Sequence, residues 1–378
     1  MNSSKIDILC LTEIEIKEII TAPPYSQPSY RAKQIFEWLH RGAKFDEMSN
    51  LPLSLRAQLK ETCIIKTPKI ERKLTSADKT IKYLFRLYDG EHVEGVLMNY
   101  EYGKTICVSS QVGCRMGCRF CASTLAGKVR NLSASEILGQ VLAAQKDISK
   151  SVNNSKNAGG APRISGVVMM GIGEPLDNFD ETVRFLQLLS APGGLNIGLR
   201  HVSVSTCGIV PRIYELAELG LPVTLSISLH AATDAKRSRI MPINRRYGID
   251  ELLLACRDYF DKTGRRISFE YALIEGENDT ISDANNLAKL LKQYMGSEGE
   301  RPFHVNLIPL NKVRETGLSG SRTTSVRAFA SALKAQGVNV TIRRKLGSDI
   351  DASCGQLRIA AEQMAKKERA KIYNNSNK

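Results

Sequence analysis

Three cysteines of the chain, Cys114, Cys118 and Cys121, lie within eight residues. Their C-x3-C-x2-C spacing lets three thiolates converge on one soft-metal centre, and thiolates are the ligands that iron–sulfur clusters and zinc prefer. A cubane cluster has four irons, so three protein sulfurs leave one iron open for a ligand from outside the protein. Gly113 and Gly117 let the backbone bend tightly around such a centre.

The same cysteines could instead form a zinc knuckle or be buried structural thiols. Zinc usually takes four ligands in two clustered pairs. No second pair of cysteines and no nearby histidine follows within reach of the motif. The spacing therefore favours an iron–sulfur cluster, and a zinc site is the alternative.

The composition predicts a protein of a reducing compartment. The chain has 378 residues, enough for two or three modest domains or for one large α/β domain with a small appendage. No apolar run approaches the length of a membrane span, and the first residues lack the apolar core of a signal peptide. Nine cysteines, unpatterned outside the central motif, do not indicate a secreted disulfide framework. We therefore expect a cytoplasmic protein without membrane contact.

The charge of the chain indicates a polyanionic partner. The formal net charge is +14, and the segment from Arg301 to the C-terminus holds fifteen lysines or arginines against five acidic residues. Such clustering favours a binding surface over a uniform bias of composition. RNA is the first candidate for the partner.

The first hundred residues change from a helical to a strand pattern. Residues 1–65 predict small helices, one of them with an apolar stripe of Ile35, Trp38 and Leu39. This module either contacts RNA phosphates or caps the main core, and the sequence favours neither. Residues 69–110 then alternate with a period of two around the turn dipeptide at Asp89, which predicts a β-hairpin followed by a short strand with Cys107.

Beyond the cysteine motif, strands and helices alternate. Apolar strands are expected near 164–170, 202–206, 223–229, 267–274, 304–308 and 338–342, and amphipathic helices near 133–147, 179–190, 211–219, 250–260, 281–294 and 323–336. Repeated βα units with apolar strands predict a parallel sheet covered by helices, as a barrel or as an open doubly wound sheet. In both folds the functional residues lie at the carboxyl ends of the strands.

Polar residues follow several of these strands where the strands end. They are Gly173 and Glu174, Ser205, the run Ser228, Leu229 and His230, and Asn311. Any one of them alone reads as a capping or turn residue. On successive strand ends of one sheet, they predict a binding site for a ligand with polar groups.

Three further residues are ambiguous when taken singly. Cys354 follows the last predicted strand in a run of small residues, which suits a reactive thiol. Cys107 lies seven residues before the cysteine motif. Each cysteine alone is more typical of an inert buried thiol, and Glu94 alone is typical of the solvent-facing side of a hairpin.

The cysteine spacing resembles the signature of the radical S-adenosylmethionine (SAM) superfamily. Residues 107–121 and 130–132 also closely resemble the dual-specificity radical-SAM methyltransferases that methylate adenine C2 in 23S rRNA and tRNA, the RlmN family. The same family is matched, in the same order, by residues 171–176, 226–230, 239–243 and 354–357. The resemblance runs from the N-terminal helices to about residue 360.

This resemblance implies an α/β fold built on a partial (βα)6 barrel of the TIM type. An N-terminal helical accessory domain that contacts RNA would span residues 1–65, and a β-hairpin linker with Glu94 would span 66–102. The barrel core with its Cys354 loop would span 103–360. We expect residues 361–378 to form a basic, disordered tail.

The resemblance also implies the cofactors and partners. Cys114, Cys118 and Cys121 would hold one [4Fe-4S] cluster whose open iron chelates SAM, and two SAM molecules would be used per turnover. The residues implied to hold SAM are Gly173, Glu174, Ser205, Ser228, Leu229, His230 and Asn311. The implied partners are 23S rRNA, tRNA and an electron donor of the flavodoxin or ferredoxin type, and we expect a monomer.

A radical mechanism comes with the resemblance. Adenine C2 is not nucleophilic, so polar methylation by SAM cannot reach it. In the family, one SAM methylates the loop cysteine, here Cys354, and a second is cleaved to a 5′-deoxyadenosyl radical that abstracts hydrogen from the S-methyl group. The methylene radical adds to C2. Glu94 resembles the base that then removes the C2 proton, and Cys107 the thiol that releases the RNA and leaves a Cys107–Cys354 disulfide.

Three alternatives remain open at the level of the sequence. A related resistance methyltransferase modifies C8 of the same rRNA adenine with the same cluster and both cysteines, although Pro175 and residues 309–311 resemble the C2 group. A non-catalytic RNA-binding protein with a structural metal site is a second alternative. The third is a radical-SAM enzyme for a peptide or a small metabolite, for which the basic C-terminal region would have no purpose.

Overall fold

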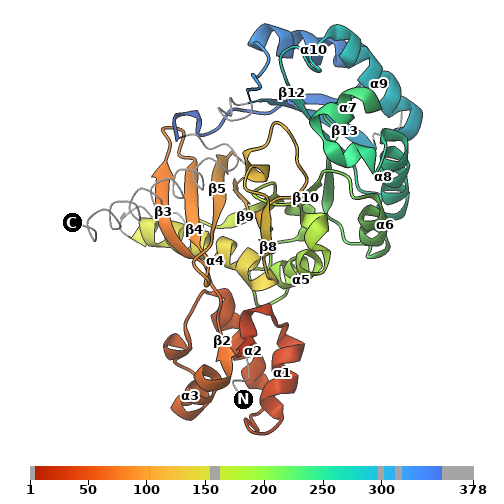
Figure 1. The fold of residues 1–378 in the computed structure, drawn as a ribbon. Helices are drawn as coiled ribbons and strands as arrows, with labels where there is room; N and C mark the ends of the chain where they lie inside the picture. The colour runs from red at the N-terminus through yellow and green to blue at the C-terminus, as the bar shows by residue number, and fades with distance from the viewer. Residues whose placement is uncertain (1–4, 102, 154–161, 297–301, 311–316, 351–378) are drawn as a thin grey trace, which may run out of the picture.

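A computed structural model describes residues 5–101, 103–153, 162–296, 302–310 and 317–350 of the chain. Cys354, Asn311 and the predicted tail lie outside these ranges. A helical module, red in Figure 1, lies at one end of the molecule, and a large sheet with covering helices forms the rest. None of the helices in the described ranges combines the length and the apolar character that a bilayer crossing needs.

The strands of the structure are β1 (Ile6–Asp7), β2 (Cys63–Ile64), β3 (Lys69–Thr75), β4 (Ile81–Arg86), β5 (His92–Tyr100), β6 (Gly103–Cys107), β7 (Gln111–Gly113), β8 (Lys128–Asn131), β9 (Ile164–Met169), β10 (Val202–Thr206), β11 (Thr224–Ser228), β12 (Ile267–Leu273), β13 (Phe303–Pro309) and β14 (Val340–Ile342). The α-helices are α1 (Glu13–Thr21), α2 (Tyr30–His40), α3 (Leu53–Thr62), α4 (Ala134–Asn153), α5 (Phe179–Ser190), α6 (Val210–Glu218), α7 (Asp234–Ile240), α8 (Ile249–Thr263), α9 (Ile281–Met295) and α10 (Thr323–Ala335).

Ten strands form one sheet in the order β14-β13-β12-β11-β10-β9-β6-β5-β4-β3. The seven strands from β14 to β6 are parallel to their neighbours, and their spatial order follows their order in the chain. A doubly wound sheet would reverse this order at a switch point. The structure therefore excludes the doubly wound alternative and confirms the α/β partial barrel, with the βα alternation at the predicted positions.

The predicted hairpin is part of the same sheet. β4 and β5 pair in antiparallel fashion on either side of the predicted turn, and the structure adds β3 on the outer side. β5 also pairs with β6, where Val96 lies opposite Cys107. Residues 66–102 thus extend the barrel sheet by three antiparallel strands, and this extension places Glu94 next to the first barrel strand.

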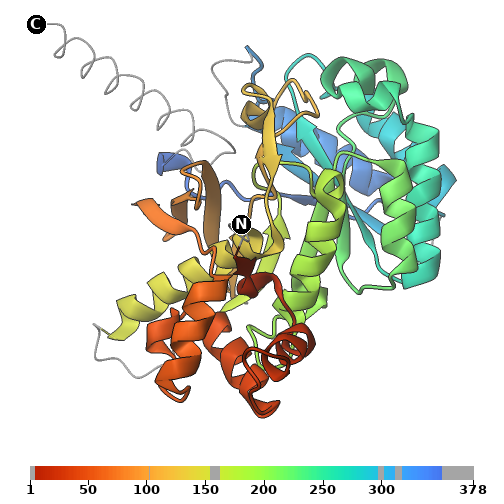
Figure 2. The ribbon, with the colours of Figure 1, turned by 60° about the horizontal axis from the view of Figure 1, so that its bottom comes forward.

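The N-terminal helices pack on the barrel through a shared hydrophobic core. Polar contacts join the two parts: Arg184 of α5 forms an ion pair with Glu15 at 2.8 Å, and Asp7 accepts a hydrogen bond from Ser135 at the start of α4. Figure 2 shows the helical module in front of α4, yellow, and beside α5. The module therefore caps the main core, and its predicted contact with RNA stays a prediction.

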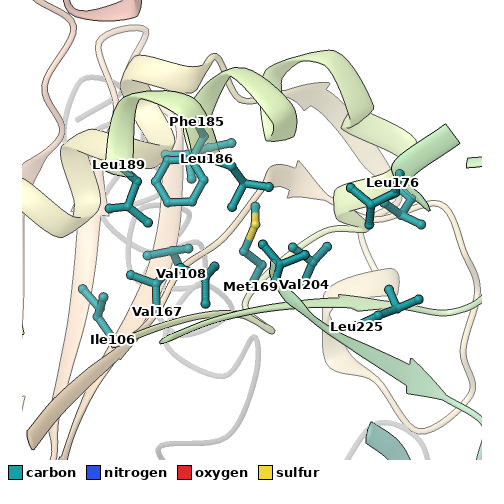
Figure 3. Close-up of a cluster of buried hydrophobic side chains, with 14 of the residues drawn as sticks. Ile106, Val108, Val167, Met169, Leu176, Phe185, Leu186, Leu189, Val204 and Leu225 are labelled. Carbon is teal, nitrogen blue, oxygen red and sulfur yellow. The ribbon is translucent and has the colours of Figure 1, made fainter. Parts of the chain in front are cut away.

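One apolar layer holds the first barrel strands in place. In Figure 3, Phe185, Leu186 and Leu189 of α5 point toward Ile106 and Val167 on the strands below. All of these side chains are fully buried. Burying a side chain of this size stabilises the fold by roughly 1.5–3 kcal/mol. This layer holds β6 and β9 in place against α5. Residues at the carboxyl ends of these two strands line the cavity described below.

His40 at the end of α2 makes the stability of the packed N-terminal module depend on pH. Its ring packs against Gly194, its Nδ1 accepts a hydrogen bond from the Leu195 amide at 3.4 Å, and its Nε2 is buried without a partner among the described residues. Burial lowers the pKa of His40 to about 4. The unfolded chain, with a histidine pKa near 6.5, therefore binds one more proton than the folded chain between these values.

We predict that the His40 contribution to stability is complete above about pH 6.5 and is lost as the pH falls toward 4. His40→Gln should flatten the dependence of unfolding free energy on pH in this window by about 1.4 kcal/mol per pH unit. Denaturant unfolding at several pH values measures the slope. Substitution of the exposed His201 by Gln is the control, and an equal change of slope in that variant would contradict the assignment to His40.

Candidate active site

A cavity of about 320 Å³ lies at the carboxyl ends of the barrel strands. Ten of the residues predicted from the sequence line it: Glu94, Cys107, Cys114, Cys118, Cys121, Gly173, Glu174, Ser205, Ser228 and His230. Leu229, which follows the last residue of β11, is predicted to hold SAM, yet its side chain is fully buried in the hydrophobic core. Cys354 and Asn311 are outside the described residues.

A two-stranded ribbon closes the loop that carries the three cysteines. β7 pairs with β8 in antiparallel fashion, so the loop leaves and re-enters at one place. The Cys114 amide donates to the Gly127 carbonyl at 3.0 Å, and the Arg119 amide donates to the Ile240 carbonyl at 2.9 Å. The first contact closes the loop on itself, and the second ties it to the end of α7, so the cysteines face the cavity from a fixed wall.

The segment before the loop packs directly on the glycine-rich turn after β9. The Ile172 amide donates to Ser109 Oγ, and the Glu174 amide donates to Gln111 Oε1, both at 2.9 Å. Gly173 has φ +109°, and a methyl group on it would lie 2.7 Å from the Gln111 backbone nitrogen. The two backbones can approach this closely because glycine has no side chain and tolerates this φ.

The three cysteines have the environment that an iron–sulfur cluster requires. Burial raises the pKa of Cys114 to about 12 and raises that of Cys118 still further. Such thiols become thiolates only when a positively charged centre binds them and displaces the protons. Met116, Phe120 and Met241 line the same cavity and exclude water from this wall. The donor set and its apolar surroundings therefore fit the cluster that the sequence predicts.

The zinc alternative fits less well. Among the residues that the structure describes, no three histidine, cysteine, aspartate or glutamate side chains converge closely enough to hold a single metal ion. A tetrahedral zinc site needs ligands that converge on one ion. The described residues therefore offer no assembled zinc site, and Cys114, Cys118 and Cys121 line one cavity wall.

Glu174 links two neighbouring strand ends. Its Oε1 accepts from the Leu176 amide at 3.0 Å, and its Oε2 accepts from the Cys207 amide after β10 at 2.8 Å. Burial raises the pKa of Glu174, and the amide donors oppose this rise. Cys207, to which the sequence assigns no role, packs with Cys118 and Met241 in a small apolar cluster beside the cavity.

His230 enters the cavity as a neutral ring. Its Nδ1 accepts from the Ala272 amide at 2.9 Å, and burial lowers its pKa to about 3. The backbone donor fixes the tautomer, so the proton lies on Nε2, which can donate to a ligand. Phe120 of the cysteine loop packs edge to face on the ring at 4.7 Å. The backbone of His230 adopts φ +57°, which turns the chain at the strand end.

Arg237 is a functional candidate that sequence reasoning missed. It is fully buried, and its guanidinium donates to the carbonyls of Leu229 at 3.1 Å and Cys207 at 2.7 Å and to Asn244 at 2.8 Å. These bonds join the ends of β10 and β11 beneath the cavity. In the sequence, Arg237 stands among other basic residues of a short helix, and nothing marks it as buried.

Glu94 and Cys107 lie on one face of neighbouring strands. Cys107 pairs with Val96, which is two residues beyond Glu94 and therefore on the same side of β5. Diagonal neighbours of this kind are about 7–8 Å apart. Glu94 is buried and forms an ion pair at 3.7 Å with Lys82, which is also buried. The solvent-facing interpretation of Glu94 is therefore wrong, because both faces of this hairpin are covered.

Charges on two sides act on the Cys107 thiol. Burial raises its pKa to about 11, Arg343 after β14 opposes the rise, and Glu94 adds to it. Glu270 of β12 lines the same cavity, where its carboxylate accepts hydrogen bonds from Ser268 and Asn306. Sequence reasoning missed Lys82, Glu270 and Arg343. Lys82 and Glu270 interrupt apolar strands, which is a weak signal of a buried polar group.

Comparisons with known proteins agree with this architecture. The model of the radical SAM superfamily matches residues 108–291, which hold the cysteine loop and most barrel strands. A solved structure described as a radical SAM methyltransferase from Sphaerobacter thermophilus is 41% identical, has a TM-score of 0.82, and covers 93% of this chain and 98% of its own. The fold and the site thus define a member of the radical SAM superfamily.

Further comparisons give the family. The model of the ribosomal RNA large subunit methyltransferase N-terminal domain matches residues 6–65. A probable dual-specificity RNA methyltransferase RlmN of Alkaliphilus oremlandii is 50% identical over 356 residues, which cover 94% of this chain and 98% of that protein. A probable dual-specificity RNA methyltransferase RlmN of Clostridium perfringens is 48% identical over 355 residues, which cover 93% of this chain and 96% of that protein. The chain belongs to the RlmN family of radical SAM methyltransferases.

The tight contact at Gly173 leads to a stability prediction. Gly173→Ala should lower the free energy of unfolding by roughly 1–3 kcal/mol more than Gly90→Ala, because only the first methyl group meets neighbouring atoms. Gly90 also has a positive φ, +89°, but nothing lies within 4 Å of its added methyl group. Denaturant unfolding of both variants measures the difference. Equal losses would mean that φ alone, and no close packing, requires glycine at position 173.

Proposed function

We propose that the chain methylates C2 of an adenosine at the peptidyl-transferase centre of 23S rRNA and of an adenosine in tRNA. The named relatives are dual-specificity RNA methyltransferases. The observation that carries the proposal is that one cavity is lined by the three motif cysteines, by Glu94 and by Cys107. The net charge of +14 is consistent with an RNA substrate.

The cofactors would be held by the cavity walls. Cys114, Cys118 and Cys121 would bind the [4Fe-4S] cluster, while the polar strand ends from Gly173 to His230 would bind SAM, two molecules per turnover. When bound, the cluster and SAM supply the one-electron cleavage that makes a methyl carbon reactive toward an aromatic ring. The neutral His230 can donate a hydrogen bond to SAM without adding a second positive charge beside its sulfonium.

In this proposal Cys354 carries the methyl group to the RNA, and Glu94 removes the proton from C2 of the adduct. The ion pair with Lys82 supports the second role, because it holds the buried carboxylate in place beside the cavity. A general base must come within hydrogen-bond reach of that proton. The open side of the cavity, next to β5, is where the base of the nucleotide would lie.

Cys107 then acts as the thiol that releases the product. Its thiolate attacks the sulfur of Cys354, and a disulfide forms as the bond between that sulfur and the methylene carbon on C2 breaks. The released carbon takes up a proton and becomes the methyl group of the RNA. The pKa of about 11 keeps Cys107 a protonated thiol in the resting site, which protects it from premature oxidation, since the thiolate is the reactive form. An electron donor of the flavodoxin or ferredoxin type would reduce the cluster, and a reductant would cleave the Cys107–Cys354 disulfide and restore both thiols for the next cycle.

The proposal is tested by the methylated product. We expect that the anaerobically reconstituted protein, incubated with unmodified 23S rRNA fragment or tRNA, SAM and a reductant, yields 2-methyladenosine. Mass spectrometry of the digested RNA identifies the nucleoside. Recovery of 8-methyladenosine would favour the related C8 methyltransferase. A colourless, zinc-containing protein that modifies no RNA would favour the non-catalytic alternative.

The role of Cys107 makes a separate prediction. Cys107→Ala should accumulate a covalent protein–RNA adduct through Cys354 and lose multiple turnover, because no thiol remains to attack the adduct. Gel electrophoresis under denaturing conditions, before and after nuclease treatment, detects the adduct. Cys256→Ala is the matched control, since Cys256 is also buried but lies on the core-facing side of α8, away from the cavity. Clean turnover by Cys107→Ala would remove this residue from the mechanism.

A further inference from the structure

The chain that follows β14 crosses the open side of the barrel. We call residues 343–350 the strap. The strap starts where the Arg343 amide donates to the Leu307 carbonyl at 2.9 Å, at one edge of the ten-stranded sheet. It ends beside the turn between β3 and β4, at the opposite edge. Figures 1 and 2 both show this blue end of the described chain beside the tip of the β3–β4 hairpin.

Two aspartates fasten the strap to that turn. Asp78 of the turn accepts a hydrogen bond from the Gly347 amide at 2.8 Å. Asp349 of the strap accepts from the Ala77 amide at 3.0 Å and from the Ser76 hydroxyl. The Gly347 amide is the main reason that the pKa of Asp78 falls to about 2, and the Ser76 hydroxyl is the main reason that the pKa of Asp349 is lowered. Both carboxylates are therefore ionised at neutral pH, and the attachment is intact.

The first part of the strap places three cations at the mouth of the cavity. Arg343, Arg344 and Lys345 all line it, with Arg343 half-buried and the other two exposed. None of the three forms an ion pair with a carboxylate of the described residues. A second cavity, of about 400 Å³, shares Arg343 and Arg344 with the first and also includes the exposed Glu101, which forms no ion pair with either arginine in the described part of the chain.

The carboxylates in the cavity do not neutralise these cations by direct contact. Glu94 is paired with Lys82, Glu174 accepts from two backbone amides, and Glu270 accepts from Ser268 and Asn306. Each acid is thus occupied by groups of the barrel wall. Burial raises the pKa of Glu270, and Arg343 opposes this rise by acting on the carboxylate through space, whereas no such partner is found for Arg344 and Lys345 among the described residues. The rim consequently presents a net positive charge, held in a fixed place by the attachment at the β3–β4 turn.

We propose that the strap is a phosphate-binding rim, in which Arg343, Arg344 and Lys345 hold the backbone of the RNA strand on both sides of the target nucleotide. This rests on the proposed function. An enzyme that acts on a base takes that base out of the stack into its pocket, so the flanking phosphates stay at the mouth. Arginine binds phosphate oxygens in a bidentate fork, and lysine binds them as a point charge.

The salt dependence of RNA binding tests the charges. For the double variant Arg344→Gln and Lys345→Gln, the slope of log K against log salt concentration should fall by roughly 0.7–0.9 per lost phosphate contact, and affinity at physiological salt should drop about tenfold. Fluorescence anisotropy with an unmodified tRNA stem-loop measures both. The matched control replaces two exposed cations of the outer helices, Lys289→Gln and Lys334→Gln. If the salt slope and the affinity fall equally in the control variant, the proposal that the strap binds phosphates is wrong.

The attachment of Asp349 to the β3–β4 turn predicts a change in RNA affinity opposite to the change that net charge alone would cause. Asp349→Ala removes a negative charge, so a protein that attracts RNA only by net charge should bind more tightly. The proposal predicts weaker binding, by several-fold, because the three cations lose their fixed position. An unchanged melting temperature of the variant verifies that the fold is intact. Tighter or equal binding would show that the attachment does not position the rim.

These experiments separate the rim from the proposed function. If the wild-type protein neither binds nor methylates RNA, the proposed function fails. If the wild-type protein methylates adenosine while the Arg344 and Lys345 double variant keeps the full salt slope, the rim alone fails. The binding measurement needs no SAM and no turnover, so its outcome does not depend on the chemistry of the cavity.

Discussion

The close approach of two backbone segments, residues 109–111 and 171–174, is the constraint on which the site depends. Ser109 Oγ and Gln111 Oε1 accept hydrogen bonds from the amides of the glycine-rich turn, and Gly173 leaves no room for a side chain between the segments. One segment leads into the cysteine loop, and the other carries Glu174. Because the two segments are joined by direct backbone contact, the predicted cluster ligands and the predicted SAM contacts keep a fixed position relative to each other.

The charges of the site are arranged in two zones. Inside the cavity, burial raises the pKa of the thiols and of Glu174 and lowers that of His230, so each group tends toward its neutral form. The carboxylates of Glu94, Glu174 and Glu270 in the cavity each contact groups of the protein: a buried lysine, backbone amides, or a hydroxyl and a side-chain amide. At the mouth, exposed cations stand without carboxylate partners among the described residues. A low-dielectric interior for radical chemistry and a positive entrance for RNA can thus coexist within one cavity.

The antiparallel extension of the sheet adds what a barrel alone would lack. β5 pairs with β6, so that Glu94 comes to lie on the same face as Cys107. The same extension provides Lys82 from β4 and the turn to which Asp349 is bound. Three strands that the sequence predicts as a linker therefore contribute the residue that we propose as the base, the lysine paired with it and the far support of the strap.

The sequence by itself determined the elements and the local motif. Periodicity gave the alternating strands and helices of the barrel, and the spacing of Cys114, Cys118 and Cys121 indicated the cluster, because both signals arise from neighbouring residues. Only the tertiary structure decided which polar residues are buried and what they meet. Arg237 joins two strand ends, Lys82 faces Glu94, and Asp349 meets Ser76 from 273 residues away. Such contacts depend on how the sheet closes, and no local pattern records that.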